Sequence, residues 1–350
     1  MQMEKSSVSK NWRVVYRKPG DTEVIQLVEE TIPAPNSNEV LIRVEAAGVA
    51  FADIVMRNGL YHDQPKFPMT PGYDVCGEII SVGSNVSRKY QVGQRVVGLS
   101  IFGSYADFLC LEPSLLLPVP NTISPARVIS LCLNYVSAWQ MLTRFAGVEP
   151  GDTVLVHAAG GGVGTAFLQL APLLDIQVIG TVSSSKKDIV DSLGGVAIDY
   201  KKNDFVKEVL KITKGKGVDA AFDAIGARSC IKTLKCLAPT GRLVHYGVTS
   251  GFKRGKKKSV DLALDYLFGQ KPVLSYLLNN QSLLSYNIHE LSKSRPHWYL
   301  EDLSKLVSLL DSGHINPIIA DVYSLEKAKE AQKEFVKSTK PGKYILINSW

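Results

Sequence analysis

One glycine-rich segment carries the clearest chemistry in this sequence. Residues 153–157 read Thr-Val-Leu-Val-His, and an Ala-Ala-Gly-Gly-Gly-Val-Gly run at 158–164 leads into a helical pattern at 165–174. A strand, a glycine turn and a helix in this order cradle a pyrophosphate in dinucleotide-binding folds, because glycines let the backbone approach and the helix start offers free N–H groups. We expect such a cradle here, with a purely structural turn as the alternative. Its predicted contacts are Ala159, Gly161, Gly162, Val163 and Gly164.

The end of the next β-type run indicates which cofactor the cradle holds. An NAD enzyme places a carboxylate about 20 residues beyond the glycines, on the ribose 2′-hydroxyl. Here the run ends in Ser183-Ser-Ser-Lys-Lys187 with no carboxylate before Asp188, and hydroxyls beside two cations suit a 2′-phosphate. We predict NADPH, held through Ser183 and Lys187; the alternative is a solvated lysine pair that opens a helix. Tyr200 either covers the adenine end or is an ordinary loop tyrosine.

The elements around this segment predict two domains of different kinds. Short β-type runs separated by Gly, Pro and Asn predict an antiparallel β domain; they cover residues 40–44, 75–82, 95–99 and 105–109. From about residue 129, strands alternate with helical patterns, which predicts an α/β fold with a parallel sheet. Its strands are expected at 153–157, 177–182, 218–222 and 242–246, and later elements at 301–310, 325–336 and 344–347. Pro172 should kink or end the first helix because it removes a helical N–H group.

Composition places the chain among ordinary globular proteins. The 350 residues are 45% apolar and 21% charged, and their number fits two domains. The net charge of +7 favours anionic ligands without requiring nucleic acid. Five cysteines, none in a CxxC spacing, indicate a reducing compartment. Because residues 1–13 are polar and no apolar run is long enough to span a bilayer, we expect a cytoplasmic protein.

Beyond the cradle, several short blocks resemble one known family across nearly the whole chain. They are Gly48-Val-Ala-Phe-Ala-Asp53, Gly59-Leu-Tyr61, Pro71-Gly-Tyr-Asp-Val-Cys-Gly77, Val92-Gly-Gln-Arg-Val96, Val156-His-Ala-Ala-Gly-Gly-Gly-Val-Gly164 and Gly241-Arg-Leu-Val244. The chain resembles the zinc-independent medium-chain dehydrogenase/reductases, specifically quinone oxidoreductases of the zeta-crystallin type. Three further segments most resemble the vesicle amine transport protein-like branch of this family. They are Leu133-Asn-Tyr-Val-Ser-Ala138, Ile198-Asp-Tyr200 and Gly313-His-Ile-Asn-Pro317.

The resemblance implies a domain plan and further cofactor contacts. It implies a GroES-like catalytic domain formed by residues 1–126 and 290–350, a Rossmann NADPH-binding domain at 127–289, and an active site in the cleft between them. By the same resemblance Asn134 and Ser137 approach the cofactor phosphates, Gly247 approaches the nicotinamide half, and Lys343 pairs with the pyrophosphate. A homodimer is implied too, because the family pairs edge strands of its cofactor domains; residues 272–276 offer such an edge.

Departures from the family pattern bear on the chemistry. Zinc relatives carry a Cys where this chain has Ala50 and a Gly-His-Glu where it has Gly72-Tyr-Asp74, so we predict no metal. Quinone reductases have an Asn at the first position and a Tyr five residues later, where this chain has Ala50 and Val55. Tyr61 is retained, and we predict that it donates a hydrogen bond to the developing oxyanion; simple packing is the alternative. Asp53 is expected to brace a loop.

Together these features predict an NADPH-dependent oxidoreductase that transfers hydride to quinones or α,β-unsaturated carbonyls without metal. Two alternatives stay open: an enoyl-thioester reductase, and a nucleotide-binding membrane-trafficking or regulatory protein with little turnover. The basic run 253–258 is a solvated loop or a weak peripheral contact with anionic lipid. The expected partners are a small-molecule quinone or enone and a second copy of the chain, with no role for nucleic acid.

Overall fold

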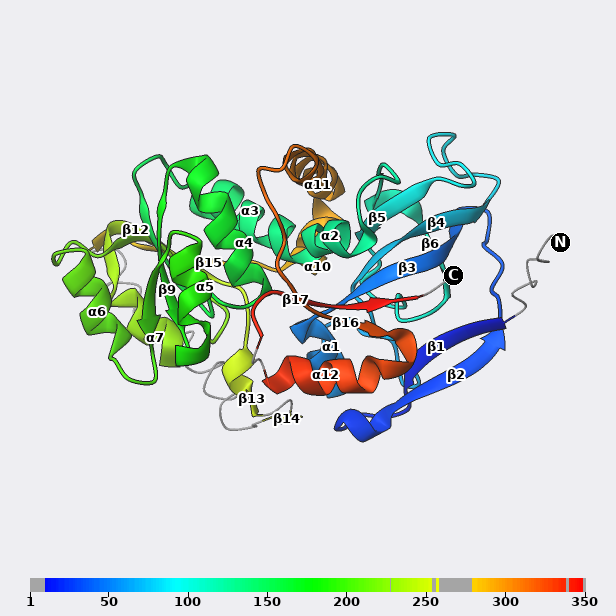
Figure 1. The fold of residues 1–350 in the computed structure, drawn as a ribbon, viewed down its shortest axis with the longest axis horizontal. Coiled ribbons are helices and arrows are strands. Elements are labelled where there is room, and N and C mark those ends of the chain that lie inside the picture. Colours follow the sequence, from blue (N-terminus) through cyan, green and yellow to red (C-terminus); the bar gives the residue numbers. More distant parts are fainter. Residues whose placement is uncertain (1–9, 227, 254–255, 258–278, 338–339, 349–350) are drawn as a thin grey trace. The chain divides into compact units, whose positions relative to one another are not determined.

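A computed structural model describes residues 10–226, 228–253, 256–257, 279–337 and 340–348. The chain divides into two compact units. Unit 1 comprises Met1–Ile129, Val322–Lys333 and Ile345–Trp350, and unit 2 comprises Ser130–Asp321 and Glu334–Tyr344. Figure 1 shows the elements of both units, coloured along the sequence.

Unit 1 is rich in antiparallel strands. Its strands are β1 (Lys10–Tyr16), β2 (Ile25–Thr31), β3 (Val40–Val49), β4 (Asp74–Val82), β5 (Arg95–Leu99), β6 (Phe108–Leu111) and β7 (Leu116–Pro118). Its helical segments are η1 (Thr22–Val24), α1 (Phe51–Arg57), η2 (Pro113–Leu115), η8 (Leu325–Lys327) and the start of α12 (Ala328–Lys337), and α2 (Pro125–Ser130) ends at its boundary. Strands β16 (Ile319–Ser324) and β17 (Lys343–Ile347) extend its main sheet, whose order is β16-β17-β3-β4-β5-β7.

The core of unit 1 follows from alternation along its strands. Val40, Ile42 and Val44 occupy alternate positions of β3, so they point to one face of the sheet. There they pack with Val75 and Ile79 of β4 in one buried cluster. The opposite face of β3 is buried less regularly, as expected for a sheet whose main core lies on one side.

Unit 2 alternates strands and helices. Its strands are β8 (Thr153–His157), β9 (Gln177–Val182), β10 (Val196–Asp199), β11 (Val218–Asp223), β12 (Leu237–His245), β13 (Phe252–Lys253), β14 (Lys256–Lys257) and β15 (Ser282–Ser285). Its main helices are α3 (Val136–Gln140), α4 (Gly162–Leu170), α5 (Lys187–Ser192), α6 (Phe205–Ile212), α7 (Arg228–Leu234), α10 (Ile288–Ser294) and α11 (Pro296–Asp311). Two π-helical segments, η3 (Leu131–Tyr135) and η4 (Met141–Ala146), adjoin α3 on either side. Short 3-10 segments are η5 (Ala171–Leu174), η6 (Ser184–Lys186) and η7 (Thr249–Gly251).

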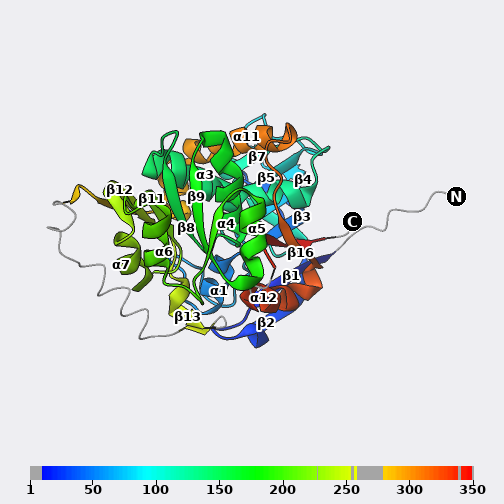
Figure 2. The same ribbon diagram turned by 60° about the vertical axis from the view of Figure 1, so that its left-hand side comes forward.

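The large sheet of unit 2 is parallel, with the order β10-β9-β8-β11-β12-β15. The chain starts at β8, builds outward through β9 and β10, and then returns to the other side of β8 to form β11 and β12. Figure 2 shows α6 and α7 on one side of these strands and α4 and α5 on the other. The order reverses beside β8, and ligands of open parallel sheets bind at the carboxyl ends of strands at such a point.

The sequence predicted this architecture well. The parallel sheet, the antiparallel β-rich part and the mixed α/β class are confirmed. Helix α4 ends at Leu170, and the chain continues as the 3-10 turn η5 with Pro172 inside it, as the missing proline N–H predicts. Strand β15 was not predicted because it is short. Helix α6 was not predicted either, although its sequence carries a signal: Asp204 caps it, and apolar residues recur at helical spacing from Phe205 to Ile212.

The compact units differ from the sequence-based domain bounds where the chain returns to unit 1. The sequence implied a return near residue 290, whereas unit 1 resumes at Val322. The reason is that α11 packs on the helices that open unit 2: the phenol of Tyr299 donates to the Cys132 carbonyl (3.3 Å), and the guanidinium of Arg144 donates to the Asp302 carboxylate (2.8 Å). The two units are defined by which segments pack together. The division into a catalytic and a cofactor-binding domain stays a prediction.

Candidate functional site

The glycine segment forms a tight turn between β8 and α4. Ala158, the first residue after β8, has a φ of 55°, a left-handed conformation that side chains rarely adopt. A Cβ on Gly164 would lie 2.5 Å from the Ala158 carbonyl oxygen, so the helix can approach the strand this closely only with glycine there. Helix α4 starts after Gly161 and no side chain caps it. Its first N–H groups are therefore available to an anion.

Two further segments of unit 2 border this turn. Asn134 is buried against it, because a Cβ on Gly162 would lie 2.3 Å from the Asn134 amide nitrogen. Gly161 forms a parallel β-bridge with Gly342, the residue before the buried Lys343. Two of the contacts that the family resemblance implied, Asn134 and Lys343, thus lie on segments adjoining the turn.

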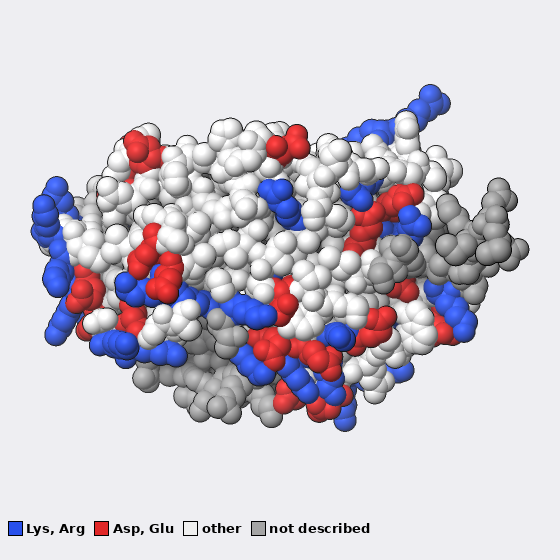
Figure 3. All heavy atoms as spheres, in the orientation of Figure 1, with Lys and Arg blue, Asp and Glu red and all other residues white. Residues whose placement is uncertain are grey.

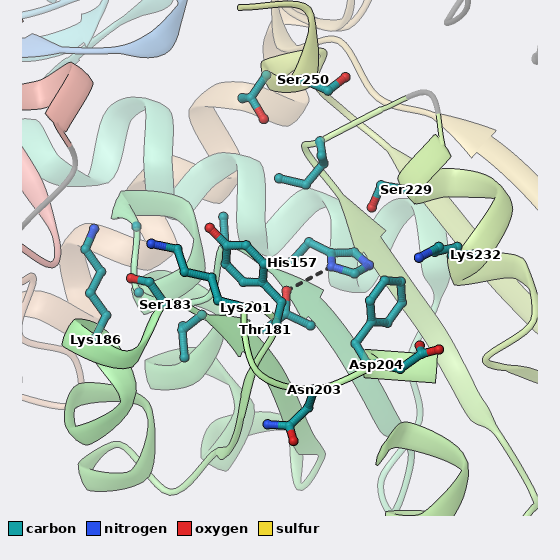
Figure 4. A pocket seen from close by; sticks show the side chains of 18 of the residues that line it. His157, Thr181, Ser183, Lys186, Lys201, Asn203, Asp204, Ser229, Lys232 and Ser250 are labelled. Carbon is teal, nitrogen blue, oxygen red and sulfur yellow. Dashed lines mark hydrogen bonds between the residues drawn. The ribbon is translucent and has the colours of Figure 1, made fainter. Parts of the chain in front are cut away.

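A cavity of about 580 Å³ opens beside this turn at the carboxyl ends of the strands. Figure 4 shows Ser183 and Lys186 on one side, Ser229 and Lys232 on the opposite side, and His157 and Thr181 between them. The lining residues all belong to unit 2; they are His157, Ala158, Gly160, Gly161, Thr181, Val182, Ser183, Lys186, Tyr200, Lys201, Asn203, Asp204, Phe205, Ile225, Ser229, Lys232, Thr249, Ser250 and Lys337.

The two lysines at the end of the Ser183–Lys187 run, from which NADPH was predicted, differ in burial and in their contacts. Lys186 lines the cavity, is only 7% exposed, and packs so closely on Gly160 that a Cβ there would lie 2.8 Å from its side chain. Burial lowers the pKa of its amine to about 8. Lys187 is exposed and pairs with Asp191 one helical turn away (2.9 Å), outside the cavity lining. Of the two lysines, Lys186 therefore faces the cavity. Lys187 is solvated at the start of α5, as the alternative interpretation expected of it.

The other predicted cofactor residues divide into two groups. Gly161, Ser183 and Tyr200 line the cavity, and Tyr200 is 52% exposed at its mouth. Outside the lining lie Ala159, Gly162, Val163, Gly164, Asn134, Ser137, Gly247 and Lys343. Most of these shape the turn or adjoin it, as described above. Ser137 is buried on α3 and hydrogen-bonds with the phenol of Tyr286, and the His245 ring contacts the Gly247 carbonyl (2.6 Å).

The wall of the cavity contains a buried histidine. The Nδ1 atom of His157 lies 2.9 Å from the Thr181 hydroxyl, and its Nε2 atom lies 2.8 Å from the Thr233 hydroxyl, which donates to Asp223 (3.1 Å). Burial lowers the pKa of His157, and the nearby Asp223 carboxylate opposes this shift. His157 is therefore neutral near pH 7 and serves as an ordered polar wall.

Several cavity residues were not singled out from the sequence. They are Lys186, Lys201, Lys232 and Lys337, with the hydroxyls of Ser229 and Ser250. For Lys186 a signal existed, since it belongs to the run that predicted NADPH. The others come from separate segments that meet only in the fold. Figure 3 shows several basic side chains at the left-hand end of the view, where α6 lies in Figure 1. Lys207 and Lys211 of α6 are exposed. Their field favours an anionic ligand.

Tyr61, the predicted hydrogen-bond donor, belongs to unit 1. It follows α1, is half-buried, and its phenol oxygen lies 2.7 Å from that of Tyr73. Asp53 is fully buried, and its carboxylate accepts hydrogen bonds from the Ala50 N–H (2.8 Å), the Gly72 N–H (3.2 Å) and the phenol of Tyr105. Asp53 thus joins α1 to the loop before β4, which is the bracing role expected of it.

The residues at the zinc-ligand positions of the relatives have other tasks here. Ala50 offers no donor atom, the Tyr73 phenol contacts Tyr61, and the Asp74 carboxylate accepts the Gly48 N–H (2.7 Å). This donor set does not fit a tetrahedral zinc site, which needs thiolate, imidazole or free carboxylate ligands.

Three further predictions concern surfaces. Within the described part of the chain, no helix is both long and apolar enough to cross a bilayer. The edge at 272–276, on which the homodimer was predicted, lies outside the described residues, as does part of the basic run 253–258. Homodimerisation and lipid contact stay predictions.

Comparison with known proteins now identifies the family. A family model described as "Alcohol dehydrogenase GroES-like domain" matches residues 36–121, and one described as "Zinc-binding dehydrogenase" matches residues 162–291. The synaptic vesicle membrane protein VAT-1 homolog of Mus musculus is 32% identical over 319 residues, which cover 90% of this chain and 78% of that protein. The probable quinone oxidoreductase of Schizosaccharomyces pombe is 31% identical over 339 residues, covering 96% and 97%.

A solved structure agrees with these sequence matches. The quinone oxidoreductase of Escherichia coli, complexed with NADPH, superposes with a TM-score of 0.85 at 28% identity and covers 96% of this chain and all of that one (100%). The fold is thus a β-rich GroES-like part combined with a parallel-sheet Rossmann part. The chain belongs to the medium-chain dehydrogenase/reductase family of oxidoreductases, and the resemblance inferred from its motifs is confirmed.

Proposed function

We propose that this protein is an NADPH-dependent oxidoreductase that reduces quinones or α,β-unsaturated carbonyls without a metal. The observation that carries the proposal is the buried Lys186 beside an uncapped helix start, in one cavity of unit 2. Relatives named as quinone oxidoreductases, one of them complexed with NADPH, support it.

The residues present fit this cofactor. The pyrophosphate would lie at the start of α4, where a glycine at 161 keeps the approach open: a Cβ there would meet no atom closer than the Ala158 oxygen at 3.2 Å. The 2′-phosphate would lie against Lys186 and Ser183. Tyr200 would cover the adenine end at the mouth of the cavity. No carboxylate follows β9 directly, where an NAD enzyme would hold the ribose 2′-hydroxyl. The Asp199 carboxylate at the end of β10 already accepts a hydrogen bond from the Ser184 hydroxyl.

Bound NADPH would supply a hydride to an electron-poor carbon of the acceptor. This chain's part is to bind and orient the reactants and to stabilise the charge that develops on the acceptor oxygen. In the proposed mechanism Tyr61 donates a hydrogen bond to that oxygen, because a preorganised donor stabilises the charged transition state more than the neutral ground state. Quinones and conjugated carbonyls accept hydride without Lewis-acid activation, which agrees with the unsuitable donor set at the zinc positions.

A spectrophotometric screen tests the proposal. Purified protein, treated with a chelator, is mixed with NADPH and a panel of quinones, enals and enoyl thioesters. We expect steady NADPH consumption with quinones or enals. Consumption restricted to enoyl thioesters would favour the thioester reductase, and tight nucleotide binding without consumption would favour a regulatory protein. Activity that disappears with the metal would contradict a metal-independent mechanism.

A further inference from the structure

The phenols of Tyr61 and Tyr73 form a hydrogen-bonded pair, of which the proposed mechanism uses only Tyr61. Their oxygens lie 2.7 Å apart, and their rings meet edge to face with centroids 5.9 Å apart. Tyr73 is 1% exposed, whereas Tyr61 is half-buried. One phenol is therefore fixed in the core of unit 1, and the other is accessible while bonded to it.

The backbone that carries Tyr73 is held from both sides. The N–H of Gly72 donates to the buried Asp53 carboxylate (3.2 Å). The carbonyl of Tyr73 accepts from the N–H groups of Ser100 (3.1 Å) and Ile101 (3.0 Å). A buried ring on a backbone with these bonds has little freedom, so the Tyr73 oxygen is a fixed point in the unit.

The same loop also positions Tyr61. Phe102, the residue after Ile101, contacts the Tyr61 ring edge to face, with centroids 5.9 Å apart. The N–H of Tyr61 donates to the Gln64 side chain (3.0 Å). Tyr61 is thus held by its ring, its backbone and its oxygen, which is the arrangement a preorganised donor needs.

We propose that Tyr73 is a positioning residue for Tyr61: by donating its own proton to the Tyr61 oxygen, it turns the Tyr61 O–H toward the acceptor and strengthens it as a donor. This inference rests on the proposed function. Each phenol has one proton, so the Tyr61 proton is directed away from Tyr73 only in this arrangement. A hydroxyl that accepts a hydrogen bond is also a better donor, because successive bonds polarise one another. Tyr73 thereby supplies a polar partner in a chain that has Ala50 and Val55 in place of the relatives' amide and phenol.

The test compares Tyr73→Phe with the wild type under steady-state conditions with one quinone and one enone. Phe keeps the buried ring and removes the oxygen. We expect kcat to fall by about 3- to 30-fold with little change in KM, less than the roughly 100-fold lost with a full oxyanion-hole donor. In the Tyr61→Phe background the same change should cost almost nothing more, since both substitutions remove one linked pair.

Tyr90→Phe is the matched control. The Tyr90 phenol is buried in the same unit and bonds to the carbonyls of Pro113 (2.6 Å) and Leu116 (2.9 Å), so its loss measures the cost of removing a buried hydroxyl elsewhere. This variant should lower thermal stability and leave kcat unchanged. A fall in kcat equal to that of Tyr73→Phe would mean that general loosening of the unit explains both, and would overturn the inference.

A second readout does not depend on turnover. Alkaline titration of ring-labelled tyrosine, followed by NMR and assigned with Tyr61→Phe, gives the ionisation of Tyr61. Because a donor stabilises a phenolate, Tyr73→Phe should raise the pKa of Tyr61. Wild-type kcat together with an unchanged titration in Tyr73→Phe would overturn the inference and leave the proposed function intact. Absence of turnover in the wild type with every acceptor would instead overturn the proposed function, and the positioning role with it.

Discussion

The glycine turn of unit 2 and the tyrosine pair of unit 1 prepare for chemistry in opposite ways. In the turn the backbone N–H groups are the functional groups. Its glycines have no side chain, which leaves room for an anion at the start of α4 and for the close packing of α4 on β8. At Tyr61 a side-chain oxygen is the functional group, and neighbouring side chains fix it. Substitutions that add atoms should therefore damage the glycine turn, whereas substitutions that remove atoms should damage the tyrosine pair.

The largest effect is expected from adding one carbon at Gly164. Gly164→Ala places a Cβ 2.5 Å from backbone atoms of Ala158 and Ala159, which cannot move without opening the contact of α4 with β8. The free energy of unfolding should fall by about 1–3 kcal/mol or more, as for other overpacked sites. Thermal or denaturant unfolding measures it.

Gly161→Ala is the matched substitution. Its Cβ meets the Ala158 oxygen at 3.2 Å, so the protein should fold with nearly wild-type stability while NADPH affinity falls, because the added methyl lies where the phosphate approaches. Equal losses of stability in the two variants would show that both glycines serve only the turn.

Removing the buried charge should give the next largest effect. Lys186→Met keeps an apolar side chain where the β, γ and δ carbons of Lys186 pack on Gly160, and it removes the ammonium group. A charge-assisted phosphate contact is worth about 1.5–3 kcal/mol, so NADPH affinity should fall roughly 10- to 150-fold while NADH affinity changes little. Isothermal titration measures both. Lys187→Met, which removes the surface pair with Asp191, is the control and should bind like the wild type. The reverse ranking would restore Lys187 as the phosphate contact.

Removing the phenol oxygen of Tyr61 should have a smaller effect on catalysis. Tyr61→Phe should lower kcat by less than roughly 100-fold, with NADPH affinity unchanged, because one neutral donor is lost and the ring remains. If Tyr61 only packs, the Phe variant keeps full activity, whereas Tyr61→Ala impairs acceptor binding. Steady-state kinetics of both variants separates the two roles.

The smallest effect is expected in the pH dependence of NADPH binding, which tests the role of the Lys186 amine. Burial lowers the pKa of Lys186 to about 8 in the free protein, and a bound phosphate favours the charged amine. NADPH affinity should therefore weaken as pH rises above about 8, by up to about tenfold per pH unit, and NADH affinity should not. A flat NADPH profile, or an equal slope in Lys186→Met, would contradict this role.

The same shift has a consequence for stability. The ordinary pKa of a lysine in an unfolded chain is near 10.4, so between about pH 8 and that value the unfolded state binds more protons than the folded one. The contribution of Lys186 to the free energy of unfolding should thus rise with pH across this window. Comparing the wild type with Lys186→Met at several pH values measures it.

The two regions also differ in how far the sequence could predict them. The turn is contiguous, so strand, glycines and helix could be recognised together, and Pro172 could be placed correctly at the end of the helix. The choice between adjacent lysines could not be made, because only the fold decides which of two consecutive side chains faces the cavity. The partnership of Tyr61 with Tyr73 needed the fold, which brings the two oxygens together across a loop.

NADPH-dependent reduction is tested by steady-state kinetics of the purified protein with one quinone and one enone, with NADPH and NADH compared at equal concentrations. We expect measurable turnover with at least one acceptor and a kcat/KM that is higher with NADPH than with NADH. Tight NADPH binding without oxidation by either acceptor, or equal efficiency with both cofactors, would contradict it.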